Sequence, residues 1–248
     1  MSSQIEFIRP ALLNGQGISS WFTLRNHETV NQNNKIPGLN LGLNTIEPKD
    51  VVERNQHFLL KSLGLDEQQL AYAKQVHKTN IETVNTGGEY PDTDGLVTSE
   101  TNLILGIQVA DCAAILLGDS KNRVIGAAHA GWRGAADNIC IKVINNMKKL
   151  GADVKHIKAF VSPCISLKNF EVGEKVAEQF PSRYVDYRSY KKPHVDLSSF
   201  IKGQLTEQGI LKGNIELSDV CTIDNENLYS YRRQKDQSGR MMALIKLN

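Results

Sequence analysis

The sequence predicts an α/β protein of the α+β type, in which helices accompany mixed rather than purely parallel sheets. The chain has 248 residues, of which 40% are hydrophobic, and this length is enough to bury a full core. Strand-type and helix-type runs are mixed along the chain rather than segregated. Two apolar runs also flank a cluster of turn residues, which indicates a β-hairpin and therefore at least one antiparallel pair.

The first third of the chain predicts a loop, a helix and a strand. Residues 27–40 form a polar stretch that we expect to be an ordered surface loop. Residues 48–65 place apolar side chains at helical spacing before Gly64, which is a typical helix stop. Residues 71–84, AYAKQVHKTNIETV, alternate as a strand that leads to a Gly-Gly turn.

The central stretch, residues 101–132, contains the predicted hairpin, with Gly118-Asp119-Ser120-Lys121-Asn122 as its turn cluster. A helix over 135–151 follows directly, because its apolar residues share one face and Gly151 ends it. The remaining runs predict strands over 154–166, 214–223 and 240–247 and helices over 169–180 and 196–209.

Composition excludes several classes of protein. Lys and Arg number 29 against 27 Asp and Glu, and no dense basic stripe indicates a nucleic-acid surface. No apolar run could span a bilayer, and the N-terminus lacks a signal-peptide pattern, so we expect a cytoplasmic protein without membrane contact. No linker divides the chain, which predicts a single domain over 1–248. The four cysteines (Cys112, Cys140, Cys164 and Cys221) form no CxxC motif, so we expect core residues, ligands or nucleophiles rather than disulfides.

The stretch VIGAAHAGWRGAA, residues 124–136, places His129 among small and aliphatic residues. If the hairpin turns at Ser120-Lys121, cross-strand partners have residue numbers that add up to 241, and Cys112 then faces His129. Directly opposed residues have Cβ atoms about 4.5–5.5 Å apart on one face. A shared metal ion could bridge that separation.

His77, in KQVHKTN, is the candidate third ligand because it stands at a strand end beside turn residues. A His2Cys set leaves one tetrahedral position for water or substrate, as in catalytic rather than structural zinc sites. The spacing alone also fits a plainer interpretation, in which Cys112 is a small core residue and the histidines are hydrogen-bonded at strand ends. Asp111 points away from Cys112 in an alternating strand, so we expect it to fix backbone or support the site rather than ligate.

Eight segments, in order along nearly the whole chain, resemble the laccase-domain family, long named multicopper polyphenol oxidases and understood as zinc purine nucleoside phosphorylases with adenosine deaminase activity. They are KQVHKTN, DTDGLV, ADCAAILL, AAHAGWRG, SPCIS, NFEVGEKV, HVDL and CTIDNENLYSYRR. The resemblance implies zinc held by His77, Cys112 and His129. It also implies a layered α/β/β/α fold, similar to cysteine hydrolase toxins, and adenosine, inosine and methylthioadenosine as substrates.

The residues themselves argue against laccase chemistry, because a multicopper oxidase needs several coppers held largely by histidines, and this chain has six scattered histidines without a His-x-His pair. Copper could still bind at the same His2Cys site, since raw affinity favours Cu(II) over Zn(II). The expected partners are therefore purine nucleosides and phosphate, and a homodimer is left open.

Phosphorolysis needs cations that hold phosphate. Arg133 lies at a predicted helix N-terminus, and Gly131 would permit close backbone approach, so we expect both to contact substrate. Arg232 and Arg233 form the other candidate clamp, and the family pattern favours Arg233 as the catalytic member. Asp111 is included among the substrate-binding candidates.

Deamination would use water activated at the open zinc position. The HxE…PCxxC signature of other zinc deaminases is missing, and the general base stays open between Asp111, Asp94 and a water. Two other functions are alternatives. One is a metal-free cysteine hydrolase or deamidase with Cys112 as nucleophile and a histidine as base. The other is a protein that edits peptidoglycan precursors, as some bacterial relatives suggest.

Overall fold

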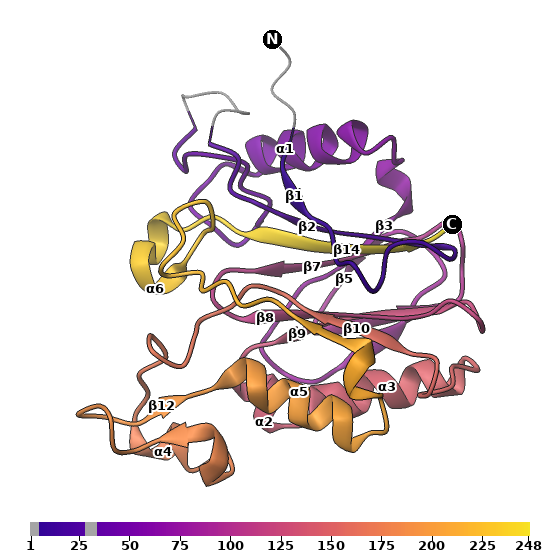
Figure 1. Cartoon of the computed structure of the whole chain (residues 1–248). Helices are drawn as coiled ribbons and strands as arrows, with labels where there is room; N and C mark the ends of the chain where they lie inside the picture. The colour runs from indigo at the N-terminus through magenta and orange to yellow at the C-terminus, as the bar shows by residue number, and fades with distance from the viewer. Residues whose placement is uncertain (1–4, 28–33) are drawn as a thin grey trace.

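The computed structural model describes residues 5–27 and 34–248. The expected loop over 27–40 therefore falls in part, at residues 28–33, outside the described residues. The described residues form four layers, which Figure 1 shows from top to bottom as α1, a first sheet, a second sheet, and α3 with α5. This is the layered α/β/β/α arrangement with mixed sheets that was expected.

Among the described residues, each of the two large sheets has six strands. In spatial order the first sheet consists of β1 (Phe7–Ile8), β2 (Ile18–Thr23), β14 (Met241–Leu247), β7 (Ile104–Val109), β3 (Leu70–Ala73) and β5 (Gly88–Tyr90). Its pairs are antiparallel from β1 to β7, and the pairs of β7 with β3 and β3 with β5 are parallel.

The second sheet has parallel pairs at its two edges and antiparallel pairs in its centre. In spatial order it consists of β13 (Ile215–Leu217), β10 (Lys158–Val161), β8 (Ala113–Asp119), β9 (Val124–Ala130), β6 (Gly95–Thr98) and β4 (Ile81–Thr83). A small ribbon of β11 (Val185–Asp186) and β12 (His194–Val195) lies apart from both.

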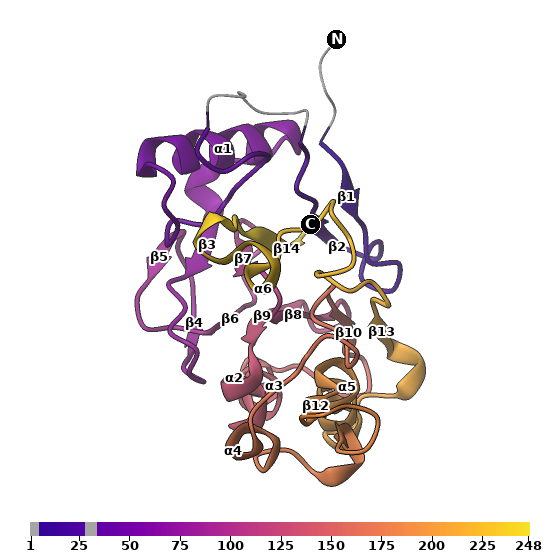
Figure 2. The same ribbon diagram turned by 90° about the vertical axis from the view of Figure 1, so that its left-hand side faces the viewer.

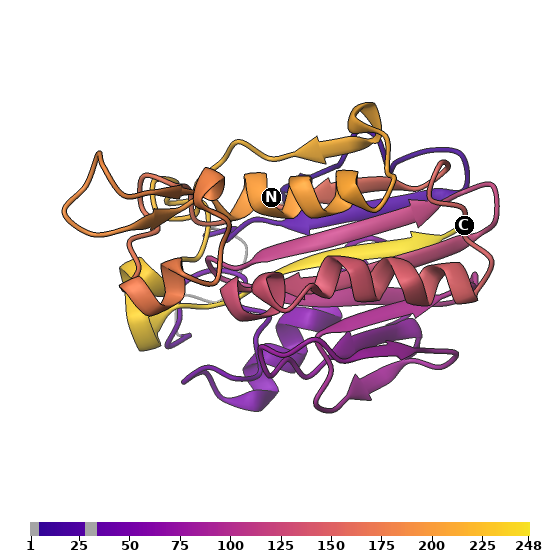
Figure 3. The ribbon, with the colours of Figure 1, turned by 90° about the horizontal axis from the view of Figure 1, so that it is seen from below.

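Within residues 5–27 and 34–248, three longer helices, α1, α3 and α5, cover the outer faces of the sheets, and three short ones lie towards one end of the layers. They are α1 (Lys49–Ser62), α2 (Trp132–Ala136), α3 (Ile139–Lys149), α4 (Glu174–Ala177), α5 (Leu197–Glu207) and α6 (Tyr231–Gln234). Figure 3, seen from below, shows α3 and α5 side by side across the second sheet. No helix in the described parts of the chain is long and apolar enough to cross a membrane.

The core follows the layers. One cluster of buried apolar side chains fills the space between the second sheet and its helices, a second lies between the two sheets, and a third lies beneath α1. Residues of β8 alternate between the first two clusters: Ile115 faces the helices and Ala114 and Leu116 face the other sheet. Because the helices bury one face of β8 and the first sheet buries the other, the strand is apolar from Ala113 to Leu117.

The predicted hairpin is present, but its register differs from the prediction by two residues. Ala114, rather than Cys112, pairs with His129, and the last pair is Asp119 with Val124. The cause is a four-residue turn, because the Asp119 carboxylate accepts the backbone N–H groups of Lys121 and Asn122. A shift of two residues keeps every side chain on its predicted face.

The long strand predicted over 71–84 is wrong: the segment divides into β3 and β4, which belong to different sheets. The predicted 135–151 helix also divides, into α2 and α3, because Asn138 adopts a left-handed conformation with φ of 64°. The expected 169–180 helix shortens to α4. All four cysteines are free thiols, as predicted.

Candidate metal centre

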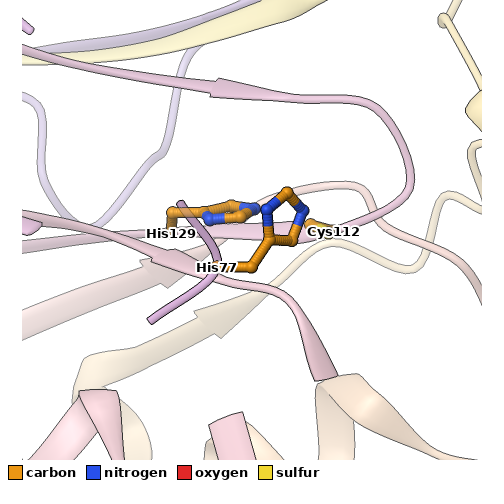
Figure 4. A group of neighbouring side chains, drawn as sticks. All are labelled: His77, Cys112 and His129. Atoms are coloured by element: carbon orange, nitrogen blue, oxygen red, sulfur yellow. The ribbon is translucent and has the colours of Figure 1, made fainter. Parts of the chain in front are cut away.

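The structure brings together His77, Cys112 and His129, the three residues that the sequence indicated as ligands. His77 lies in the loop between β3 and β4, Cys112 directly precedes β8, and His129 lies near the end of β9. One ligand atom from each lies within 4.8 Å of the others, and Figure 4 shows the side chains converging. The imidazole rings meet edge to face with centroids 4.8 Å apart.

Asp94 holds this arrangement in place from the start of β6. Its side chain is fully buried, and its carboxylate accepts the backbone N–H groups of Val76, His77 and Lys78 at 3.2, 3.0 and 2.8 Å. The loop needs this support, because His77 has φ of 60°, a conformation that is unfavourable for residues other than glycine. Three amides on one carboxylate therefore fix the position of the first ligand.

The same carboxylate orients the second histidine. Asp94 Oδ1 lies 2.8 Å from His129 Nδ1, and His129 N donates to the Asp94 carbonyl oxygen at 2.7 Å. Since an ionised carboxylate only accepts hydrogen bonds, Nδ1 carries a proton, and Nε2 is the nitrogen that can bind a metal ion once it is deprotonated. A carboxylate behind a histidine in this way is the usual support of a histidine ligand to zinc.

Charge in the cluster favours the ligating form of the thiol. Burial by itself raises the pKa of Cys112, but the neighbouring His129 and His77 outweigh it and lower the pKa to about 6. Burial likewise lowers the pKa of His129, yet the Cys112 thiolate and Asp94 raise it to about 9. Hydrogen bonds from His129 and the loop amides lower the pKa of Asp94, although burial opposes them. Without a metal, both shifts favour a thiolate at Cys112 beside an imidazolium at His129.

The donor set and its surroundings fit a zinc ion. Thiolate and imidazole are zinc ligands, at about 2.3 Å from sulfur and 2.0–2.1 Å from nitrogen, so atoms within 4.8 Å need only small torsional changes to share one ion. Gly131 provides the space for these ligands, because a Cβ at this position would lie 2.9 Å from Cys112 Sγ and 3.4 Å from His77 Cδ2. The glycine is thus required by the ligands themselves.

A pocket of about 770 Å³ opens beside the three ligands. Figure 2 looks onto this end of the layers, where α2 and α6 lie. Apolar and aromatic side chains supply much of the wall, among them Trp132, Phe170 and Tyr231, and arginines supply the charge. A pocket of this size with flat apolar walls and a few cations suits a nucleoside and an anion.

Asp111 lines the pocket and binds the C-terminal part of the chain that forms one of its walls. Its φ is 84°, its side chain is buried, and its two oxygens accept the Thr222 hydroxyl and the Arg232 N–H, each at 2.6 Å. Both Asp111 oxygens thus accept hydrogen bonds from the C-terminal segment of the chain, one from a side chain and one from a backbone N–H.

The arginines differ in where their guanidinium groups lie. Arg133 stands over the Trp132 ring at 4.3 Å, and Arg232 donates to the Glu171 carbonyl oxygen at 3.1 Å; both are exposed pocket residues. Arg233 differs, because its guanidinium donates to the backbone carbonyls of Thr222, Ile223, Asn225 and Leu228 and it is not among the pocket-lining residues. Its position does not support the expected catalytic role: it stabilises the loop before α6.

Sequence reasoning missed the role of one residue, Asp94, and did not identify another, Arg240. Asp94 was weighed as a general base, whereas its buried carboxylate is fully engaged in holding both histidines. An acidic residue directly before the buried strand GLVT was the available signal, because such a charge needs partners. Arg240, which lines the pocket from the loop before β14, had no local signal.

Comparisons with known proteins identify the family of the chain. A family model described as multi-copper polyphenol oxidoreductase laccase matches residues 19–248. A protein of Deinococcus radiodurans named purine nucleoside phosphorylase is 36% identical, over 85% of this chain and 82% of that relative. One of Bacteroides thetaiotaomicron with the same name is 29% identical, over 96% of each chain.

Solved structures show the same fold. A hypothetical protein of Bacillus licheniformis, YfiH, superimposes with a TM-score of 0.85 at 26% identity, over 93% of each chain. A protein of Neisseria meningitidis gives a TM-score of 0.85 at 27% identity, over 98% of this chain and 99% of that one.

Proposed function

The chain belongs to the family whose model is described as multi-copper polyphenol oxidoreductase laccase, and on that premise we propose that it is a zinc-dependent purine nucleoside phosphorylase. Its substrates are adenosine, inosine and S-methyl-5′-thioadenosine together with phosphate, and it has adenosine deaminase activity as well. The observation that carries the proposal is the convergence of His77, Cys112 and His129 on one wall of a pocket lined with aromatic rings and arginines. A reducing cytoplasm suits the Cys112 thiolate.

The pocket residues divide the work. Trp132, Phe170 and Tyr231 offer flat apolar surface for a purine. Arg133 and Arg232 hold anionic oxygens at the mouth, and Asp111 keeps Arg232 in place through its backbone N–H. Zinc bound by the three ligands supplies Lewis-acid polarisation.

Copper-based oxidation is disfavoured by the ligands. Among the described residues, His77, Cys112 and His129 form the cluster of metal-ligating groups, whereas a multicopper oxidase needs several histidine-rich sites. One copper ion at this cluster stays compatible with its donors.

The second candidate is the cysteine hydrolase, and one observation favours it: without a metal, Cys112, His129 and Asp94 follow one another as a nucleophile, base and orienting acid would. His77 argues for the metal instead, because a dyad has no use for a second imidazole beside the sulfur.

The test is a product assay on adenosine and inosine, with and without phosphate, together with metal analysis of the purified protein. We expect near-stoichiometric zinc, adenine and ribose 1-phosphate from adenosine only when phosphate is present, and inosine as the deamination product. His77→Ala should abolish both zinc binding and phosphorolysis. His57→Ala is the matched control, since His57 is an exposed histidine on α1 that contacts Glu67 and does not line the pocket.

Metal-free protein that carries an acyl group on Cys112 after reaction with an ester probe would refute the zinc phosphorylase and favour the hydrolase. Zinc-loaded protein that converts no nucleoside would also refute it.

A further inference from the structure

The arginines near the pocket are not equivalent, and their contacts separate them. The Arg233 guanidinium donates to four backbone carbonyls away from the pocket, while Arg133 and Arg232 are exposed at the mouth. Arg240 differs from all three, because it is partly buried and lines the same pocket wall as Asp111 and Cys112.

The backbone and stem of Arg240 are held rigidly. Arg240 N donates to Asn40 Oδ1 at 2.9 Å, and Arg240 O accepts the Leu41 N–H at 3.1 Å. Gly42 lies against the stem so closely that a Cβ there would overlap the Arg240 Cγ and lie 2.8 Å from its Cβ. The Arg240 stem therefore packs directly against the Gly42 backbone.

The guanidinium is only partly satisfied. Its Nη1 donates to the carbonyl oxygens of Ser238 and Gly239 at 2.9 Å each, and the Tyr231 ring lies 5.8 Å away. Within the described residues, neither Nε nor Nη2 has a protein acceptor. Burial lowers the pKa of Arg240, and the Cys112 thiolate, Tyr231 and Asp111 raise it in part.

Arg240 is half-buried, and its unused Nε and Nη2 donors are accessible rather than buried, so an anion in the pocket can accept hydrogen bonds from them. Among the described residues no hydrogen bond joins Asp111 to Arg240, and the Asp111 oxygens accept instead from the Thr222 hydroxyl and the Arg232 N–H. The planar fork of an arginine matches the oxygens of phosphate in a bidentate manner.

We propose that Arg240 is the residue that binds inorganic phosphate beside the metal centre, with Gly42 positioning its guanidinium. The inference rests on the proposed function for the role of the phosphate as co-substrate. Arg133 and Arg232 then contact the outer oxygens of the same phosphate from the mouth of the pocket.

The test measures phosphate binding and phosphate kinetics separately. In Arg240→Gln we expect the KM for phosphate to rise about 10- to 100-fold, with the nucleoside KM within about twofold of wild type, since a charge-assisted bidentate contact is lost. Phosphate titration without nucleoside, followed by ³¹P line broadening, should show the same weakening. Arg240→Lys keeps the charge but loses the planar guanidinium, so its phosphate KM should lie between those of the wild type and Arg240→Gln.

Gly42→Ala tests the positioning without removing the charge, and it decides the matter if Arg240→Gln does not fold. We expect it also to raise the phosphate KM, because the new methyl group displaces the Arg240 stem. Gly213→Ala is the matched control, since a Cβ at Gly213 meets nothing within 4 Å.

The outcomes separate the inference from the proposed function. Wild-type phosphate binding that depends on Arg240 but yields no ribose 1-phosphate would uphold the inference and refute the phosphorylase. Active phosphorolysis with an unchanged phosphate KM in both Arg240→Gln and Gly42→Ala would refute the inference and leave the phosphorylase intact. A wild-type protein that binds no phosphate would refute both.

Discussion

Replacing Asp94 by Asn should weaken zinc binding although Asp94 does not contact the metal. The carboxylate accepts four hydrogen bonds, from the amides of residues 76–78 and from His129 Nδ1. An asparagine keeps one acceptor oxygen and turns the other into an amino group, which faces N–H donors. The loop that carries His77 then loses its support, and His129 loses its preferred tautomer.

The magnitude follows from the contacts. Loss of a carboxylate behind a histidine ligand costs about 10- to 100-fold in metal affinity. Two hydrogen bonds to a charged group are worth about 3 kcal/mol at the lower end. Removing a buried charge also removes its desolvation cost, which offsets part of the lost hydrogen-bond energy. We therefore expect a loss of about 2 kcal/mol in the free energy of unfolding of the metal-free protein.

The assay is zinc competition against a chromophoric chelator, with urea unfolding of the metal-free protein in parallel. Asp119→Asn is a matched control, because Asp119 is also fully buried and accepts the backbone N–H groups of Lys121, Asn122 and Asp153 at the far end of the hairpin. We expect it to lose stability and to keep its zinc affinity. Equal zinc affinities in wild type, Asp94→Asn and Asp119→Asn would refute the reasoning.

Three further predictions concern the site and its surroundings. Gly131→Ala should lower zinc content because its Cβ would lie 2.9 Å from Cys112 Sγ, whereas Gly173→Ala, with nothing within 4 Å, should leave it unchanged, as metal analysis would show. In metal-free protein, alkylation of Cys112 should increase as pH rises through about 6, because the lowered pKa makes the thiolate available there. Cys140, whose pKa burial raises to about 12, should not react. A midpoint near pH 8.5 for the alkylation of Cys112 would contradict this prediction. Arg233→Gln should lower stability by about 2 kcal/mol, through the loss of backbone hydrogen bonds, with kcat retained in the folded fraction; a large fall in kcat without loss of stability would instead restore its expected catalytic role.

Local pattern predicted several elements correctly because their causes are local. Helix α1 has apolar residues at helical spacing and ends before Gly64, which has φ of 67°. The β8–β9 hairpin follows from two apolar runs around a turn cluster. Even its register error left Cys112 and His129 on the same face, because side-chain direction in a strand repeats every two residues.

The failures have a different cause. The alternation of residues 71–84 is that of a strand, but the amides of residues 76–78 bond to a carboxylate at position 94 rather than to a neighbouring strand. Nothing within 71–84 encodes that partner. The same is true of Arg240, whose direction is set by Asn40 and Gly42, two hundred positions earlier in the chain.

The sequence by itself determined the types of ligand, the faces on which Cys112 and His129 lie, and most of the helices and strands that carry them. The tertiary structure decided which groups meet: it brought His77 to the thiolate, placed Asp94 behind both histidines and directed Arg240 rather than Arg233 into the pocket. The physical reason is that hydrogen bonds from a buried carboxylate or guanidinium join segments distant in sequence, and such partners exist only once the two sheets have packed.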